Sequence, residues 1–167
     1  MNQGVWVIDA SSLIEAKKVV APANQWQLFK LLETMVEESG LFFPKQVTTE
    51  LEQARHTDTP EAWALAQGPK VTQAYDPDIT FLQHVMAVAG DVVDADAEDD
   101  PGDPYVLAQA LELADAGFDV CIVTEDVVDH LPLRISMATA CVRLKLRHCQ
   151  LQAFLADIGF NGPPQQA

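Results

Sequence analysis

The chain has 167 residues, of which 49% are apolar and 21% charged, and its formal net charge at pH 7 is −15. This length suits one domain with a sizeable core, and no run of eighteen apolar residues predicts a membrane span. The acidic excess disfavours unaided, non-specific binding to nucleic acids, whose phosphates require a basic surface. We therefore expect a single domain over 1–160 and a disordered tail at 161–167. Because no signal-peptide pattern opens the sequence, we expect a cytoplasmic location.

The first half of the chain alternates short apolar runs with amphipathic helical patterns. VWVID (5–9) has the Val and Ile content of a strand buried on both faces of a parallel sheet. Ser12 and Glu15 form a capping-box pattern that predicts a helix from about residue 13 to Val20. The remaining elements predicted in this half are a helix from Pro22 that stops at Gly40, a strand at 41–44, and helices at 46–56, 60–68 and 78–89.

The second half begins with an acidic segment that ends at Asp103. Asp103 followed by Pro104 predicts a helix N-terminus, with Asp103 as the capping residue and Gly117 beyond the helix end. DVCIVT (119–124) is the clearest central strand after the first. The other elements predicted here are a helix over 134–145, for part of which a strand through 140–146 is the alternative, a strand at 147–151, and a closing helix over 152–159.

Strands that alternate with helices indicate βαβ units and an α/β fold, with a mostly parallel sheet covered on both sides. In such sheets ligands bind beyond the carboxyl ends of the strands. Asp9 and Asp126 follow predicted strands, and Asp103 opens a predicted helix. Glu50 borders the apolar stripe of its predicted helix. We therefore expect these four acids to converge at one edge of the sheet.

Each of the four acids also has a purely structural explanation. Asp103 can be a helix cap, Asp9 and Asp126 can be turn residues, and Glu50 can lie on a solvated helix face. Their joint placement favours a divalent-metal site, because clustered carboxylates repel each other unless a cation lies among them. Carboxylate oxygens suit Mg²⁺ or Mn²⁺, and one or two such ions can promote the hydrolysis of a phosphodiester.

Four motifs, in their order and spacing, resemble the PIN-domain nucleases over residues 5–158. They are VIDASSLI, the helical Glu50, GDPYVLAQAL and VTED. The likeness is greatest to the VapC-like toxin ribonucleases of toxin-antitoxin pairs and to related, little-characterised PIN-like domains. The resemblance implies a three-layer α/β/α domain that hydrolyses RNA with Mg²⁺ or Mn²⁺ and leaves 3′-hydroxyl and 5′-phosphate ends. It assigns metal binding to Asp9, Glu50, Asp103 and Asp126, and places Ser11 and Thr124 beside them in the catalytic site.

Several assignments stay open within this resemblance. Glu125 competes with Asp126, and Asp100 competes with Asp103, for the same ligand role. Ser11 can instead assist helix capping, and Thr124 can be an ordinary strand residue. The alternative function is a catalytically inactive PIN-like interaction module. A phospho-acceptor domain is disfavoured, because Asp9 has no adjacent acid and the chain has no Walker-type glycine loop.

The expected partners follow from the same interpretation. RNA would be the substrate, and a cognate antitoxin would cover the site, with a basic side chain among the acids. The candidate surface for an antitoxin or a homodimer is the helix over 22–38, with Trp26 and Phe29. We expect no membrane partner. The candidate RNA-binding cations are Lys17, Lys18, Lys45, Arg55 and a C-terminal stretch comprising Arg134, Arg143, Lys145, Arg147 and His148.

Overall fold

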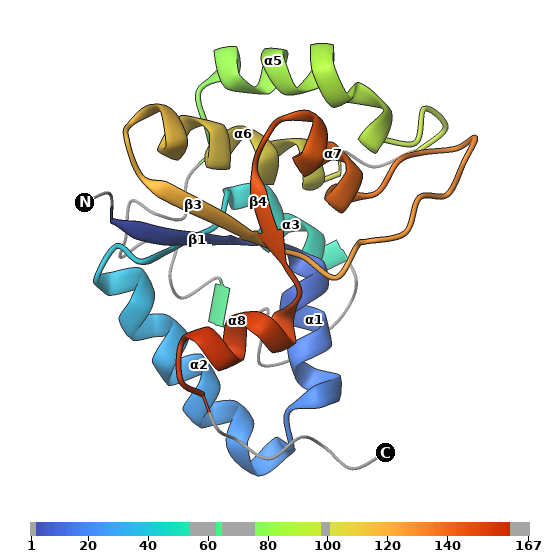
Figure 1. Cartoon of the computed structure of the whole chain (residues 1–167). Coiled ribbons are helices and arrows are strands. Elements are labelled where there is room, and N and C mark those ends of the chain that lie inside the picture. The colour runs from blue at the N-terminus through green and yellow to red at the C-terminus, as the bar shows by residue number, and fades with distance from the viewer. Residues whose placement is uncertain (1–2, 54–62, 65–75, 98–100, 161–167) are drawn as a thin grey trace.

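A computed structural model of the protein describes residues 3–53, 63–64, 76–97 and 101–160. Four strands form one sheet in the order β2-β1-β3-β4, and each neighbouring pair is parallel (Figure 1). The strands are β1 (Gly4–Ile8), β2 (Leu41–Phe42), β3 (Asp119–Val123) and β4 (Arg147–Cys149). The predicted parallel sheet is therefore confirmed, although β2 and β4 are shorter than the sequence suggested.

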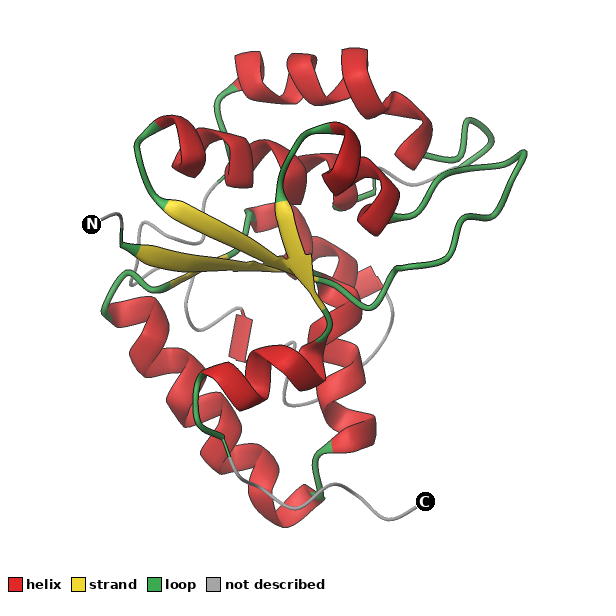
Figure 2. Cartoon of the chain, viewed as in Figure 1, coloured by secondary structure: helices red, strands yellow, loops and turns green. Residues whose placement is uncertain are grey.

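Helices cover both faces of this sheet. The helices are α1 (Ala10–Val19), α2 (Pro22–Glu37), α3 (Lys45–Gln53), α5 (Ile79–Ala89), the 3₁₀ helix η1 (Gly90–Val92), α6 (Asp103–Asp115), α7 (Met137–Arg143) and α8 (Leu151–Asp157). Figure 1 shows α5, α6 and α7 on one side of the sheet and α1, α2 and α8 on the other. The sheet therefore forms the middle layer (Figure 2), and the predicted three-layer α/β/α fold class is confirmed.

The two central strands set the position of the functional edge. Val7, Ile8, Ile122 and Val123 are fully buried, as expected for strands covered on both faces. The register of β1 against β3 pairs Ile8 with Val123, so both strands end at the same level. The residues that follow them therefore leave the sheet at the same edge.

The start of α1 differs from the predicted capping box. Asp9, and not Ser12, is the N-cap, because its carboxylate accepts a hydrogen bond from the Ser12 N–H at 2.9 Å. Asp9 has an extended backbone (φ −94°, ψ 171°), so the helix begins at Ala10, directly after the strand. The predicted cap of α6 was also wrong: the N-cap is Gly102, Asp103 is the first helical residue, and no side chain caps this end.

The helix predicted over 134–145 is shorter in the structure, and the alternative of a strand through 140–146 was wrong. Helix α7 spans Met137–Arg143, and the side chain of Ser136 caps it by accepting the Thr139 N–H at 3.1 Å. Asp129 accepts bonds from the Ser136 N–H and the Thr139 hydroxyl, both at 2.7 Å, which holds the preceding segment out of the helix. The end of α2 also differs, since Ser39, and not Gly40, has the left-handed backbone (φ 61°).

Some predicted features lie outside the described residues. They are most of the helix at 60–68, the tail at 161–167, Asp100 and Arg55. Among the helices that the structure describes, none combines the length and apolarity needed to cross a membrane.

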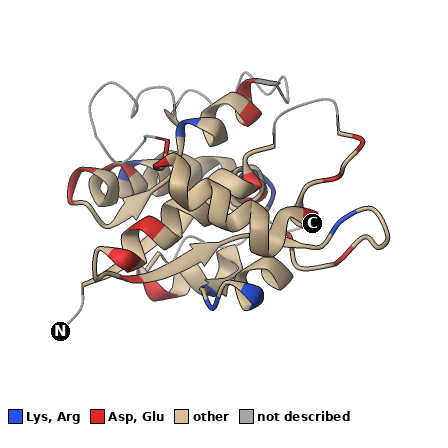
Figure 3. Ribbon diagram, turned by 90° about the horizontal axis from the view of Figure 1, so that it is seen from above, with Lys and Arg blue, Asp and Glu red and all other residues tan. Residues whose placement is uncertain are grey.

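The basic C-terminal stretch does not form one continuous surface. Its arginines each pair with an aspartate, as Arg134–Asp126 at 2.8 Å, Arg143–Asp91 at 2.7 Å and Arg147–Asp119 at 2.7 Å. Arg147 and Asp119 begin β4 and β3, so this pair lies at the amino end of the sheet, opposite the edge that follows Ile8 and Val123. Figure 3 shows the acidic and the fewer basic positions distributed over many elements.

Candidate functional site

A pocket of about 490 Å³ lies at the carboxyl ends of β1 and β3. All four predicted acids line it, together with Ser11, Glu125 and two cations, Lys18 and Arg134. The acids come from four places in the fold: Asp9 follows β1, Glu50 is in α3, Asp103 begins α6, and Asp126 follows β3. The structure thus brings together the residues that the sequence analysis grouped.

Asp9 is the most buried of these acids, with 2% of its surface exposed. Its Oδ1 atom accepts hydrogen bonds from the Ser11 hydroxyl at 2.7 Å and the Ser12 N–H at 2.9 Å. Its buried Oδ2 atom has no hydrogen-bond partner of acceptable geometry in the described structure. Burial raises the pKa of this carboxyl, against the lowering effect of nearby donors, first among them the Thr124 hydroxyl. Oδ2 is therefore a buried acceptor that a cation could satisfy.

Asp103 is not explained by helix capping. Its carboxylate makes no hydrogen bond or ion pair within the described part of the chain. Burial first, and then the charges of Asp9, Glu50 and Asp126, hold the pKa of Asp103 well above its ordinary value, while the charge of Arg134 lowers it. The carboxylates are therefore close enough to oppose one another's ionisation, and a cation among them would relieve that repulsion.

Glu50 reaches the pocket from α3 and is held there by the backbone of Gly102. The Gly102 N–H donates a short hydrogen bond to the Glu50 carboxylate. A Cβ atom added at Gly102 would lie 2.8 Å from Glu50 Cδ and Oε2, so only glycine allows this approach. The loop before α6 therefore fixes the position of an acid on α3.

Gly102→Ala is expected to move the Glu50 carboxylate with little loss of stability. The backbone at Gly102 (φ −74°, ψ −20°) suits alanine, and the obstructing atoms belong to the end of a flexible side chain. Because Glu50 would lose its orienting donor, we expect Mn²⁺ affinity to fall by about tenfold or more, measured by calorimetry. Gly90→Ala is the matched control, since Gly90 has a similar backbone (φ −61°, ψ −22°) and only Met86 nearby. Unchanged affinity in Gly102→Ala would contradict a ligand role for Glu50.

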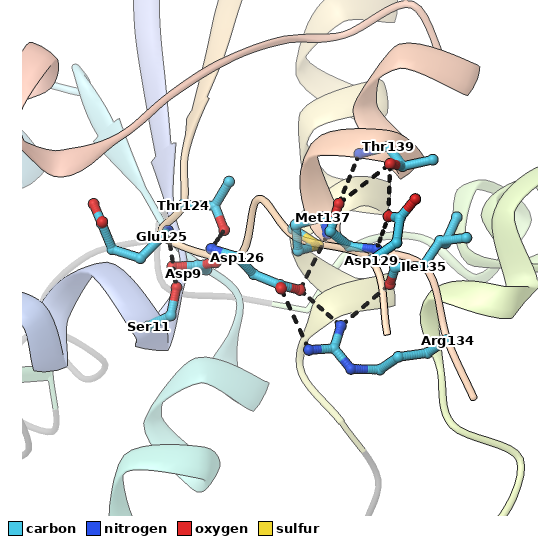
Figure 4. Close-up of polar contacts among 11 residues, drawn as sticks. Asp9, Ser11, Thr124, Glu125, Asp126, Asp129, Arg134, Ile135, Met137 and Thr139 are labelled. Carbon is cyan, nitrogen blue, oxygen red and sulfur yellow. Dashed lines mark hydrogen bonds and ion pairs between the residues drawn. The ribbon is translucent and has the colours of Figure 1, made fainter. Parts of the chain in front are cut away.

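Asp126 and Glu125 point in opposite directions (Figure 4). Glu125 accepts the Leu151 N–H at 2.6 Å and the Gln150 amide at 3.3 Å, so it is bound to the start of α8. Asp126 accepts two bonds from Arg134 and one from the Met137 N–H. Of the two adjacent acids, Asp126 is the one whose charge acts on Asp103.

Ser11 connects the ends of the two central strands, and Thr124 holds the segment that follows β3. The Ser11 hydroxyl donates to Asp9 and accepts the Glu125 N–H at 3.1 Å, so it links α1 to the segment after β3. Thr124 is buried, and its hydroxyl accepts the Asp126 N–H at 3.1 Å. Both residues therefore hold the acids in place.

The donor set fits a hard divalent cation in part. Carboxylate oxygens are available from Asp9 and Asp103, and Glu50 lines the same pocket. The arrangement is not a closed ligand cage, because no three His, Cys, Asp or Glu side chains of the described residues are gathered closely enough to hold an ion. Ion binding would therefore draw the carboxylates together.

The model of one protein family, described as a domain of unknown function (DUF4411), matches residues 6–161. The chain belongs to this family. The match extends from β1 past α8, so the DUF4411 domain contains every residue of the pocket. No curated protein matches the chain.

Two features of this DUF4411 domain were missed from the sequence. Gly102 was assigned no role, although a glycine beside a helix start is a signal for close backbone approach. Arg134 was placed at the start of a helix, whereas it lies in the loop before α7 and reaches Asp126. No local sequence pattern indicates that Arg134 pairs with Asp126, because the path of the loop between them brings the two side chains together.

Proposed function

We propose that this protein is a metal-dependent ribonuclease of the PIN-like type, acting as the toxin of a toxin-antitoxin pair. The observation that carries the proposal is the buried, unpartnered Oδ2 of Asp9 in a pocket that the three other predicted acids also line, at the carboxyl edge of a parallel sheet. Such an edge is the usual ligand site of α/β sheets. The sequence motifs of the PIN-domain nucleases fall on these same residues.

The predicted residues of the pocket have roles in the proposed reaction. Asp9 and Asp103 would hold the principal Mg²⁺ or Mn²⁺ ion, and Glu50 and Asp126 would complete or extend the site. One or two such ions would supply charge stabilisation at the scissile phosphate and activate water. Ser11 and Thr124 would keep Asp9 and the segment after β3 in register. Lys18, on the pocket rim, would attract the RNA backbone toward an otherwise acidic protein.

A partner that covers this pocket would need a basic side chain to enter among the acids, as proposed for an antitoxin.

Helix α2 offers one candidate surface for such a partner or for a second copy. Its Trp26 is 68% exposed, whereas Phe29 is buried in the core and is not part of any surface.

Cleavage of a panel of structured RNAs with Mn²⁺ tests the proposal. We expect Asp9→Asn to lower the cleavage rate by about 10³-fold, because a neutral amide replaces the central anionic ligand. Asp115→Asn removes the same charge at the exposed far end of α6 and should cleave like the wild type. Equal rates for wild type and Asp9→Asn would overturn the mechanism.

The second candidate is a PIN-like interaction module without activity. It is favoured by the engagement of both Asp126 oxygens with Arg134, which removes one acid from the set available to an ion. In this candidate the acids hold a structural ion or none, so it predicts that the wild type cleaves no RNA with Mn²⁺ and that Asp9→Asn leaves partner binding little changed.

A further inference from the structure

Arg134 is a cation built into the acidic pocket. Its Nη1 atom donates to Asp126 Oδ2 at 2.8 Å and to the Ile135 carbonyl at 3.2 Å, and its Nη2 atom donates to Asp126 Oδ1 at 3.3 Å (Figure 4). This fork-to-fork contact fixes the plane of the guanidinium group. Arg134 lines the pocket, and only 27% of its side chain is exposed.

The backbone on both sides of Arg134 is also held. Arg134 and His130 exchange two backbone hydrogen bonds, of 2.9 and 3.1 Å. The Ile135 N–H donates to the Asp91 carbonyl at 2.8 Å, and the next N–H, of Ser136, is bound by Asp129. The position of the guanidinium is thus determined before any ligand arrives.

Asp126 differs from Asp9 in how its oxygens are used. Both Asp126 oxygens accept hydrogen bonds from Arg134, and Oδ2 accepts a further bond from the Met137 N–H at 3.1 Å. Asp9 leaves a buried oxygen without a partner. A metal ion at Asp126 Oδ2 would have to displace one of its two donors, and at Oδ1 it would share the oxygen with Arg134, whereas an ion at Asp9 Oδ2 would displace no donor.

The guanidinium keeps donors for a ligand. An arginine has five N–H groups, and the three bonds above leave two of them without a partner in the described structure. The charge of Arg134 acts on Asp103, so the group faces the acids of the pocket. A phosphate held near Asp9 and Asp103 by a metal ion would meet these free donors.

We propose that Arg134 contacts the scissile phosphate of the RNA and that Asp126 is a positioning residue for Arg134 and not a metal ligand. This inference rests on the proposed function and revises one of its four acids. Arg134 would stabilise the negative charge on the non-bridging phosphate oxygens without exchanging a proton, because its guanidinium stays protonated.

The test measures Mn²⁺ binding by calorimetry and RNA cleavage kinetics in Arg134→Gln, Arg134→Lys, Asp126→Asn and the double variant. We expect Mn²⁺ affinity to change by less than about fivefold in all of them, whereas kcat/KM falls by about 10²-fold in Arg134→Gln. Asp126→Asn should reproduce much of this loss, the double variant should be no worse than Arg134→Gln, and Arg134→Lys should recover part of the rate.

The matched control is Asp119→Asn, which breaks the similar ion pair with Arg147 at the opposite edge of the sheet and should cleave like the wild type. If Asp126→Asn loses Mn²⁺ binding as Asp9→Asn does, Asp126 is a ligand and only the inference is overturned. Full activity in Arg134→Gln overturns it as well. If the wild type binds no Mn²⁺ and cleaves no RNA, the proposed function fails and the inference fails with it.

Discussion

Asp103→Asn is expected to make the metal-free protein more stable while it abolishes Mn²⁺ binding and RNA cleavage. A residue needed only for the fold would show the opposite effect on stability. The Asp103 carboxylate has no hydrogen bond or ion pair in the described structure, so the amide loses no existing contact. It does remove the repulsion from the neighbouring acids.

The sign of this effect follows from the raised pKa of Asp103. Above that pKa the carboxyl is ionised in the folded protein and opposes folding. As the pH falls below the raised pKa, the folded protein takes up a proton before the unfolded chain does, so the cost shrinks, and it is gone below the ordinary pKa of the unfolded carboxyl. The advantage of Asp103→Asn should therefore be largest at neutral pH and should shrink toward acid pH.

Thermal unfolding in EDTA at several pH values measures this difference. A gain of about 1 kcal/mol would raise Tm by about 2–4 °C in a chain of this size. Asp115→Asn, at the exposed end of the same helix, should show no such gain. A lower Tm for Asp103→Asn at neutral pH would indicate a structural role for the carboxylate.

Mn²⁺ affinity is expected to fall steeply on acidification of the wild type. Burial raises the pKa of both Asp9 and Asp103 in the metal-free protein, so an ion must displace protons from them as the pH falls toward those values. Below such a pKa the affinity decreases about tenfold per pH unit for each proton displaced.

Calorimetry in buffers of different ionisation enthalpy measures both the affinity and the number of protons released. Circular dichroism at each pH verifies that the fold persists. We expect proton release to increase as the pH falls from neutral toward the raised pKa values of Asp9 and Asp103. Binding without proton release across this range would exclude Asp9 and Asp103 as ligands.

The sheet and the grouping of the acids were predictable because they follow from periodicity. Continuous apolar runs indicated two buried parallel strands, and Asp9 and Asp126 occupy their carboxyl ends as expected. The position of Glu50 beside an apolar stripe placed it toward the core side of its helix, and in the structure it reaches the pocket. Such patterns can be recognised from a short window of sequence, because each depends only on residues that are close together along the chain.

The details that failed depend on hydrogen bonds that a helical sequence pattern does not reveal. Ser12 matches a capping box, but Asp9 lies one turn earlier, directly after the strand. The Asp9 carboxylate accepts the Ser12 N–H and so caps the helix in place of Ser12. Residues 134–136 have a helical pattern, but Asp129 and the backbone of His130 hold them in a loop. Helix propensity is a weak preference, and specific hydrogen bonds of this kind override it.

The pairing of β1 with β3 determines when the pocket can exist during synthesis. The first strand leaves the ribosome before its partner at Asp119–Val123, and the long segment between them must be made first. Contacts so distant in sequence form late, because the intervening chain must first be closed into a loop. A nascent chain that ends before β3 lacks the strand that brings Asp126 and Arg134 to Asp9. If the protein cleaves RNA as proposed, the whole segment from β1 to β3 would have to be synthesised before the new molecule could act on any transcript.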